Sequence, residues 1–152
     1  MSIIIRDARP EDIEPMVHLL QQLFAIETDF VIDPPRHRRG LARLLDGCGK
    51  HRCLKVAIAA GEVVGMGSAQ TLISTAEGGL VVLVEDLVVE KTRRNQGIGN
   101  RIAAALESWA LKRGATRLQL LADRTNFNAL DFYHHLGWRP TQMICLRRHP
   151  TP

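Results

Sequence analysis

Two neighbouring carboxylates precede a glycine-containing turn in the middle of the sequence. Glu85 and Asp86 interrupt a β-branched apolar run, and the turn at residues 94–99, Arg-Asn-Gln-Gly-Ile-Gly, opens a helical pattern. A carboxylate can take a proton from an attacking nucleophile. The free N–H groups at a helix start attract an anion, and glycine lets the backbone approach it closely. The spacing therefore predicts an acid–base group close to a site for a phosphate-bearing ligand.

The turn departs from two common phosphate-binding patterns. A dinucleotide fingerprint needs a third glycine where Ile102 stands, and a Walker loop needs a Gly-Lys-Ser/Thr sequence that is absent. The spacing Arg94-x-x-Gly97-x-Gly99 instead resembles the pyrophosphate loop of the GNAT superfamily of acyl-coenzyme A N-acyltransferases, whose pattern is Arg/Gln-x-x-Gly-x-Gly/Ala. An ordinary glycine-containing helix start is the alternative interpretation of the turn.

A second stretch downstream supports the same resemblance. GNAT enzymes often show Asn-x-x-Ala-x-x-Phe/Leu-Tyr with a short Gly-aromatic ending, which is matched here by Asn126, Ala129, Phe132, Tyr133, Gly137 and Trp138. The two motifs come in the family's order and are separated by one predicted helix and one predicted strand. The resemblance is close over residues 80–138, and its central strand is most similar to polyamine-type and other small-amine acetyltransferases.

The resemblance implies that acetyl-CoA is the cosubstrate and that no metal takes part. In the family the central strand offers backbone groups to the pantetheine arm, the loop amides hold the pyrophosphate, and a nearby arginine adds positive charge. The cofactor-binding residues implied in this sequence are Leu87, Val88, Val89, Arg94, Asn95, Gln96, Gly97, Ile98, Gly99, Asn100, Asn126, Ala129 and Tyr133.

Two residues are the candidates for acid–base catalysis. A primary ammonium has a pKa near ~10 and must lose its proton before it attacks, and Glu85 stands at the family's carboxylate position. The departing thiolate has a pKa of about 8.5, so the phenol of Tyr133, at the family's general-acid position, can protonate it. A partnered structural carboxylate and a packing tyrosine are the alternatives. In a regular strand Asp86 would point to the face opposite Glu85, unless a bulge intervenes.

Acidic residues of the loop after the first helix are the candidates for binding the acceptor. The predicted substrate-binding residues are Glu27, Asp29, Asp33, Glu85 and Asp86. Carboxylates gathered in a groove attract a cation, which favours an amine with a second positive charge, such as a polyamine. Residues 36–39, Arg-His-Arg-Arg, are more often surface charge, but they could instead bind the carboxylate of an amino acid, and solvated loop acids are a further possibility.

The pattern of elements predicts a single mixed α/β domain over residues 1–152. Strands are expected at residues 3–6, 54–59, 63–74, 81–89, 116–122 and 142–146, and helices at 13–26, 36–46, 100–113 and 126–136. With the resemblance, this order predicts the acyl-CoA N-acyltransferase fold, a mostly antiparallel sheet of about six to seven strands flanked by about four helices.

Composition limits the class of protein, its location in the cell and its partners. The 152 residues are 45% hydrophobic and 24% charged, which is typical of a soluble globular protein, and no apolar run is long enough for a membrane span. The three cysteines show no metal-type pairing and suit a reducing, cytoplasmic location. The net charge of +4 suits an anionic ligand, but with only 5% aromatic residues nucleic-acid binding is not expected.

The sequence therefore predicts an N-acetyltransferase that acts on a primary amine of a small molecule by direct attack in a ternary complex. A covalent cysteine route is disfavoured, since Cys48 and Cys53 flank a loop and Cys145 lies past the motifs. Acetylation of protein N-termini or lysines is an alternative, as is a non-catalytic module that only binds coenzyme A. Glu85 and Tyr133 favour an enzyme. A homodimer is a common state in the family.

Overall fold

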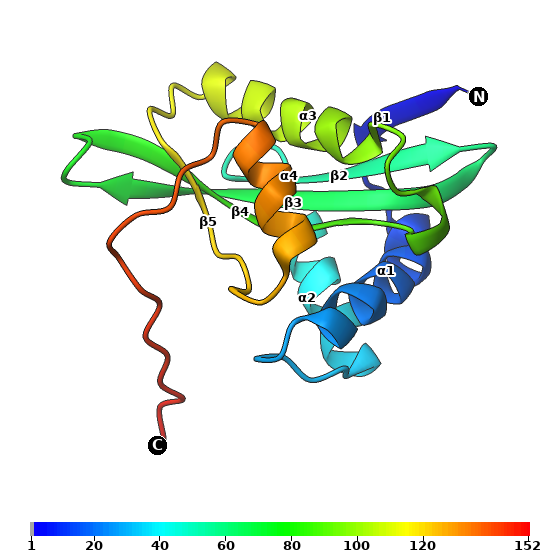
Figure 1. Ribbon diagram of the computed structural model, residues 1–152, viewed down its shortest axis with the longest axis horizontal. Coiled ribbons are helices and arrows are strands. Elements are labelled where there is room, and N and C mark those ends of the chain that lie inside the picture. Colours follow the sequence, from blue (N-terminus) through cyan, green and yellow to red (C-terminus); the bar gives the residue numbers. More distant parts are fainter. Residues whose placement is uncertain (1) are drawn as a thin grey trace. The chain divides into compact units, whose positions relative to one another are not determined.

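The computed structural model describes residues 2–152 (Figure 1). The chain divides into two compact units, Met1–Leu120 and Leu121–Pro152, and each is described by itself. No helix of the described residues is long and apolar enough to cross a membrane.

The first unit is built on one five-stranded sheet with the strands in sequence order. The strands are β1 (Ile3–Asp7), β2 (Arg52–Ala59), β3 (Glu62–Ser74), β4 (Gly79–Val89) and β5 (Leu118–Leu120). Neighbours pair antiparallel from β1 to β4, and only β4 and β5 are parallel. The predicted mixed, mostly antiparallel sheet is confirmed, with fewer strands than the six to seven expected.

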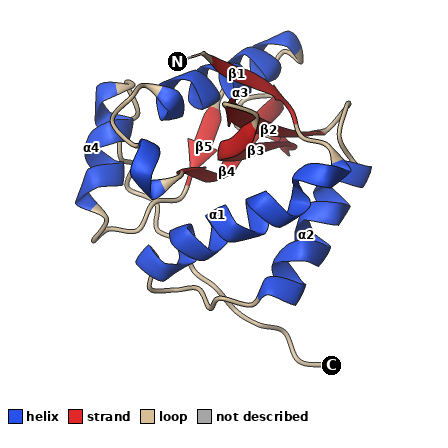
Figure 2. Ribbon diagram, turned by 90° about the vertical axis from the view of Figure 1, so that its right-hand side faces the viewer, coloured by secondary structure: helices blue, strands red, loops and turns tan. Residues whose placement is uncertain are grey.

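Helices cover both faces of this sheet (Figures 1 and 2). The helices α1 (Ile13–Ile26) and α2 (Pro34–Asp46) lie on one face, and α3 (Ile98–Lys112) lies on the other. Each presents its apolar stripe to the strands, as helical spacing predicts. The core under the first two helices consists of Met16, Val17, Leu19, Leu20, Leu41, Leu54, Val56, Met66 and Val88.

Glycines in β3 let α3 pack closely on the sheet. A Cβ at Gly67 would lie 3.0 Å from both Ile102 Cγ2 and Leu106 Cδ1, and one at Gly65 would lie 2.8 Å from Ile102 Cδ1. Ile102 and Leu106 are fully buried. Because strand residues alternate between faces, Met66 and Ser68 point to the opposite side, toward the first two helices.

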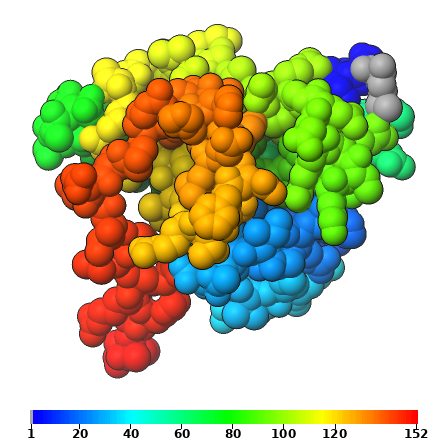
Figure 3. Space-filling view, in the orientation of Figure 1, coloured from blue at the N-terminus to red at the C-terminus, as the bar shows by residue number. Residues whose placement is uncertain are grey.

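The hairpin of β3 and β4 is longer than the helices that cover it. Its tip stands at one end of the unit, in green at the left of Figure 3. Leu72 and Ile73 near this tip are exposed. The covered part of the hairpin, around Ser68 and its partner Glu85, is the part that can enclose a site.

The second unit contains one helix, α4 (Phe127–His135). The strand predicted at residues 142–146 is wrong, because this segment has no strand structure. Its apolar side chains Met143, Ile144 and Leu146 are exposed. A strand requires hydrogen bonds to a neighbouring strand, and the second unit offers none among its described residues.

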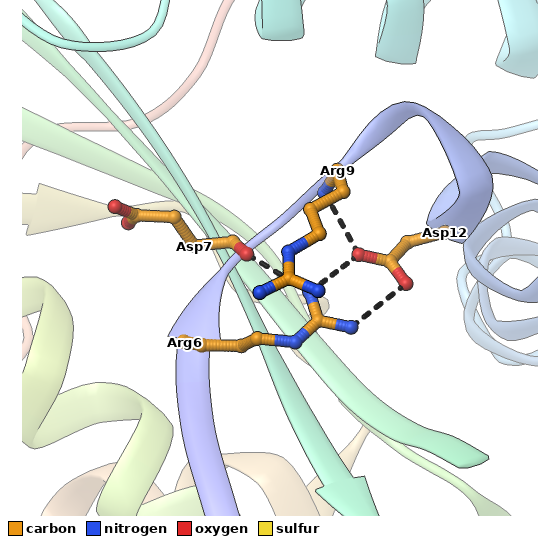
Figure 4. Close-up of polar contacts among 4 residues, drawn as sticks. All are labelled: Arg6, Asp7, Arg9 and Asp12. Atoms are coloured by element: carbon orange, nitrogen blue, oxygen red, sulfur yellow. Dashed lines mark hydrogen bonds and ion pairs between the residues drawn. The ribbon is translucent and has the colours of Figure 1, made fainter. Parts of the chain in front are cut away.

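A partly buried ion pair fixes the passage from β1 into α1 (Figure 4). The carboxylate of Asp12, in the 3-10 turn Pro10–Asp12, accepts hydrogen bonds from Arg6 Nη1 at 2.7 Å and Nη2 at 3.1 Å. It also accepts one from the Arg9 backbone N–H at 2.8 Å. Burial alone would raise the pKa of Asp12, but these donors outweigh it and hold the pKa below its usual value.

Replacing Asp12 by alanine should lower the free energy of unfolding by about 2–3 kcal/mol near neutral pH, since Arg6 would lose its partner. The folded-state pKa is depressed, so this stabilisation is complete above the unfolded pKa of about 4 and is lost as the pH falls through the folded value. Urea unfolding at several pH values measures both effects. The control Asp7→Ala removes an exposed pair with Lys55 and should cost less than about 1 kcal/mol. Equal losses in the two variants would contradict this role for Asp12.

Candidate active site

A β-bulge in β4 places two neighbouring carboxylates in one cavity. Ser68 pairs with Glu85 and Met66 pairs with Val88, so Asp86 and Leu87 together face the single residue between them, Gly67. Asp86 adopts a left-handed backbone with φ of +55°. The bulge overturns the strict alternation expected for a regular strand, and both carboxylates line the same cavity.

The cavity lies in the first unit between the sheet and the helices α1 and α2. It has a volume of about 250 Å³ and is lined by Leu20, Phe24, Arg36, His37, Gly40, Leu41, Leu44, Ser68, Gln70, Glu85 and Asp86. Its walls are largely apolar. The polar groups come from β3 and β4 on one side and from the first turns of α2 on the other.

The carboxyl of Asp86 is the most perturbed acid of this site. Glu85 is exposed, whereas Asp86 is half-buried, and both line the cavity. Burial raises the pKa of Asp86 to about 7, and the negative charges of Glu85 and Glu27 contribute to the rise. Asp86 therefore exchanges its proton close to neutral pH.

His37 enters the cavity as a neutral imidazole. Its Nε2 accepts a hydrogen bond from the Asp33 backbone N–H at 3.0 Å, so the proton of the neutral ring is on Nδ1. The ring stacks at a tilt on Phe24, with 4.9 Å between the centroids. Burial lowers the pKa of His37, and the nearby charge of Asp33 only partly opposes this. The sequence grouped His37 with surface charge, and only the fold shows that it faces a cavity.

The three acids predicted to bind the acceptor do not line the cavity. Asp33 caps α2, since its Oδ1 accepts from the Arg36 backbone N–H at 3.3 Å and its Oδ2 pairs with Arg36 Nε at 3.4 Å. Glu27 is the C-cap of α1 and acts on Asp86 through its charge. Asp29 is exposed.

Ser68 and Gln70 line the cavity but were not among the predicted site residues. The alternation of β3 held a signal for them, because they follow the core residue Met66 at a spacing of two along the strand.

The predicted pyrophosphate loop connects the end of β4 to α3. Gly97 is the N-cap of α3 with a left-handed φ of +81°, and no side chain caps this helix. The N–H groups of its first turn, which lack partners within the helix, are therefore suited to an anion. Arg94 Nε donates to the Val89 carbonyl at 3.1 Å, which holds the arginine between the strand end and the loop.

The sheet opens beyond the middle of β4. Its pairing with β5 covers only Val82, Leu83 and Val84. Among the strands of the first unit, residues 85–89 therefore have a neighbour on the β3 side alone. An extended ligand can add to such a strand edge through backbone hydrogen bonds. The predicted pantetheine-binding residues Leu87, Val88 and Val89 belong to this open stretch.

The remaining predicted residues belong to the second unit. Asn126 caps α4 by accepting a hydrogen bond from the Ala129 backbone N–H at 3.2 Å. Tyr133 is half-buried, and its ring lies 5.2 Å from that of Phe132 and 6.0 Å from that of Trp138, both edge-on. Asn126 and Ala129 thus have a structural role in starting the helix that carries Tyr133.

The sequence pattern of the Acetyltransferase (GNAT) family matches residues 46–138, which is more than half of the chain. The chain therefore belongs to the GNAT family, and it is an N-acetyltransferase. A thialysine N-epsilon-acetyltransferase of Bos taurus is 32% identical to it over 145 residues, which cover 89% of this chain and 83% of that protein.

Solved structures share the fold. A protein of Bacillus halodurans C-125 described as a transcriptional regulator has a TM-score of 0.80 and 27% identity, and the match covers 97% of this chain and 99% of that one. A predicted acetyltransferase of Clostridium acetobutylicum, solved with acetyl-CoA, has a TM-score of 0.78 at 18% identity over 97% of this chain and 96% of that one. These matches agree with the predicted acyl-CoA N-acyltransferase fold.

Proposed function

We propose that this protein transfers the acetyl group of acetyl-CoA to a primary amine of a small molecule by direct attack in a ternary complex. The observation that carries the proposal is the pair of carboxylates, Glu85 and Asp86, in a cavity on the strand that leads into the Gly97 loop. A volume of about 250 Å³ is small for a ligand site, which suits an acceptor no larger than an amino acid.

The backbone around β4 and α3 fits acetyl-CoA. The uncapped N-terminus of α3 at Gly97 suits the pyrophosphate, and the open edge at Leu87 and Val89 suits the extended pantetheine arm. Arg94 would add positive charge beside the loop. The substrate supplies an acetyl thioester, and the chain's own residues orient it and move the protons.

Three proton transfers complete the reaction. The acceptor ammonium gives its proton to a carboxylate of β4, Glu85 or Asp86, and its nitrogen then attacks the acetyl carbon. As the carbon–sulfur bond breaks, the thiolate takes a proton from the phenol of Tyr133, which stands at the family's general-acid position. The second proton of the attacking nitrogen passes through water to the phenolate and restores the phenol, which leaves an N-acetylated amine and free coenzyme A.

The acceptor we propose is a lysine-like amino acid that ends in a primary amine. Its amine would lie at Glu85 and Asp86, and its carboxylate would lie toward Arg36 and the Nδ1–H of His37, which line the cavity from α2. Because Asp33 caps α2, its carboxylate is already engaged, which argues against a site at Asp33 for a second positive charge of the acceptor. The Bos taurus relative is named for thialysine, which has this pattern of charges.

Thiol release from acetyl-CoA, measured with a panel of amines, tests the proposal. Thialysine and lysine should give a higher kcat/KM than spermidine or a simple diamine, because only they offer a carboxylate to Arg36. Preference for spermidine would contradict the amino-acid acceptor and would support a polyamine as the acceptor instead. Activity only on peptide N-termini or on lysines within proteins would contradict a small-molecule acceptor.

A further inference from the structure

The backbone at Asp86 is held in an unusual conformation. Its φ of +55° lies in the left-handed region, which is uncommon for any residue other than glycine, although aspartate adopts it more often than most. Such residues persist where the surrounding structure enforces them, and they concentrate at functional sites. Here the bulge opposite Gly67 enforces it and turns the Asp86 side chain toward the cavity, on the same side as Glu85.

The surroundings of the Asp86 carboxyl differ from those of a structural buried acid. The carboxyl of Asp12 in the same unit has three hydrogen bonds and an arginine partner. Asp86 lines a cavity walled by Leu20, Phe24 and Leu41, and within residues 2–152 its carboxyl accepts no hydrogen bond. Buried polar groups with a purely structural role are normally paired. Asp86 is therefore available to a ligand that enters the cavity.

Glu85 occupies a different environment. Its backbone carbonyl accepts a hydrogen bond from the buried Ser68 hydroxyl at 3.1 Å, which fixes the strand just before the bulge. Its side chain is exposed, so water solvates the charge. The negative charge of Glu85 acts on the neighbouring acid, Asp86.

We propose that Asp86 accepts the proton of the acceptor's ammonium group, and that Glu85 is a positioning residue that acts through its charge on Asp86. This inference rests on the proposed function and deepens it, because it assigns the base within the same cavity. It departs from the resemblance, which places the base at Glu85.

The Asp86 carboxylate takes one proton from the ammonium group and becomes a neutral carboxylic acid. The freed lone pair forms the carbon–nitrogen bond, the carbon–sulfur bond breaks, and the thiolate is protonated from a separate acid. The second proton of the nitrogen passes through water to that acid and restores it. Asp86 then returns its proton to water through the open side of the cavity.

The protonation behaviour of Asp86 suits this role. Its pKa of about 7 lies closer to that of an ammonium group, near ~10, than an ordinary carboxyl value of about 4 does. The charged or titratable groups around it are Glu85 on β4, Glu27 at the end of α1, and Arg36 and His37 on α2. The two glutamates raise the pKa, so removing either charge should lower it.

The experiment is a set of pH profiles of kcat/KM for the wild type, Asp86→Asn and Glu85→Gln, with lysine as the acceptor. The wild type should lose activity as the pH falls through about 7, the value of Asp86. Asp86→Asn should have a kcat/KM lower by ~10²-fold or more, and its profile should lack the decline below pH 7, as expected for a missing base. Glu85→Gln should retain the loss of activity at low pH, with its midpoint moved to lower pH.

A second measurement follows the ionisation of the Asp86 carboxyl directly, in the absence of turnover. Carbon-detected NMR titration of the side-chain carboxyls should show Asp86 titrating near 7 in the wild type and lower in Glu85→Gln. Unfolding curves and acetyl-CoA titration establish that each variant is folded, and Asp86→Glu, which keeps a carboxyl, should recover part of the activity. The NMR arm keeps the test decisive even if Asp86→Asn fails to fold.

Two outcomes would overturn the inference in distinguishable ways. An active Asp86→Asn with an unchanged acid limb, together with an inactive Glu85→Gln, would make Glu85 the base and leave the proposed function intact. A folded wild type that binds acetyl-CoA but releases no thiol with any amine would overturn the proposed function and this inference with it.

Discussion

Replacing Gly97 by glutamate should abolish acetyl-CoA binding while the first unit stays folded. Gly97 opens α3, and its N–H groups are proposed to face the pyrophosphate. A carboxylate at this point would stand against the phosphates, and like charges in a partly dry site repel by several kcal/mol. Calorimetric titration of the folded variant should show affinity reduced by ~10³-fold or more, the equivalent of that energy.

The matched control is Gly97→Gln. Both variants place a side chain of the same size on a backbone with a φ of +81°, so both bear the same conformational strain of roughly 1–2 kcal/mol. Only the glutamate adds charge. Unchanged affinity in a folded Gly97→Glu, or equal losses in the two variants, would contradict the assignment of the loop to the pyrophosphate.

Removing the phenol hydroxyl of Tyr133 should lower kcat by ~10²-fold or more with little change in acetyl-CoA affinity, the range expected when a general acid is lost. The Tyr133→Phe ring keeps its edge-on packing against Phe132 and Trp138. Steady-state kinetics and calorimetric titration measure the two quantities.

Trp138→Phe is the control for packing. It alters a ring contact of Tyr133 and keeps the hydroxyl, so kcat should fall by less than ~10-fold. If Tyr133→Phe turned over as fast as the wild type, Tyr133 would be a packing residue, and the thiolate would take its proton from water.

Local sequence was enough to predict the elements that carry the site. The helix predicted at residues 100–113 corresponds to α3, and its apolar residues Ile102 and Leu106 are buried. The left-handed turn at Gly97 follows from a glycine between a strand and that helix. These features depend on residues close together in the chain, so a single sequence contains the information.

The bulge at Asp86 could not be predicted in this way. It depends on how β4 pairs with Gly67 and Ser68 of the preceding strand, and this register is set by the packing of the whole sheet. The sequence shows only two adjacent acids, which a regular strand would send to opposite faces. The cavity and the perturbed pKa of Asp86 both follow from that non-local pairing.

Two other differences between the sequence predictions and the structure have physical causes. The role of Asp33 as a helix cap was available in the sequence, because an aspartate before Pro34 and Pro35 is a common helix start. The strand expected at residues 142–146 has a suitable apolar pattern, but a strand also needs a partner, which a local pattern cannot supply.

The most direct test follows both products of one reaction. The purified protein is mixed with acetyl-CoA and lysine, thiol release is recorded, and mass spectrometry measures acetylation of the amine and of the protein. We expect one N-acetylated lysine for each thiol released, and no acetylated protein when the amine is left out. Thiol release without an acetylated amine, or an acetyl group held on Cys48 or Cys145, would contradict direct transfer to a small amine.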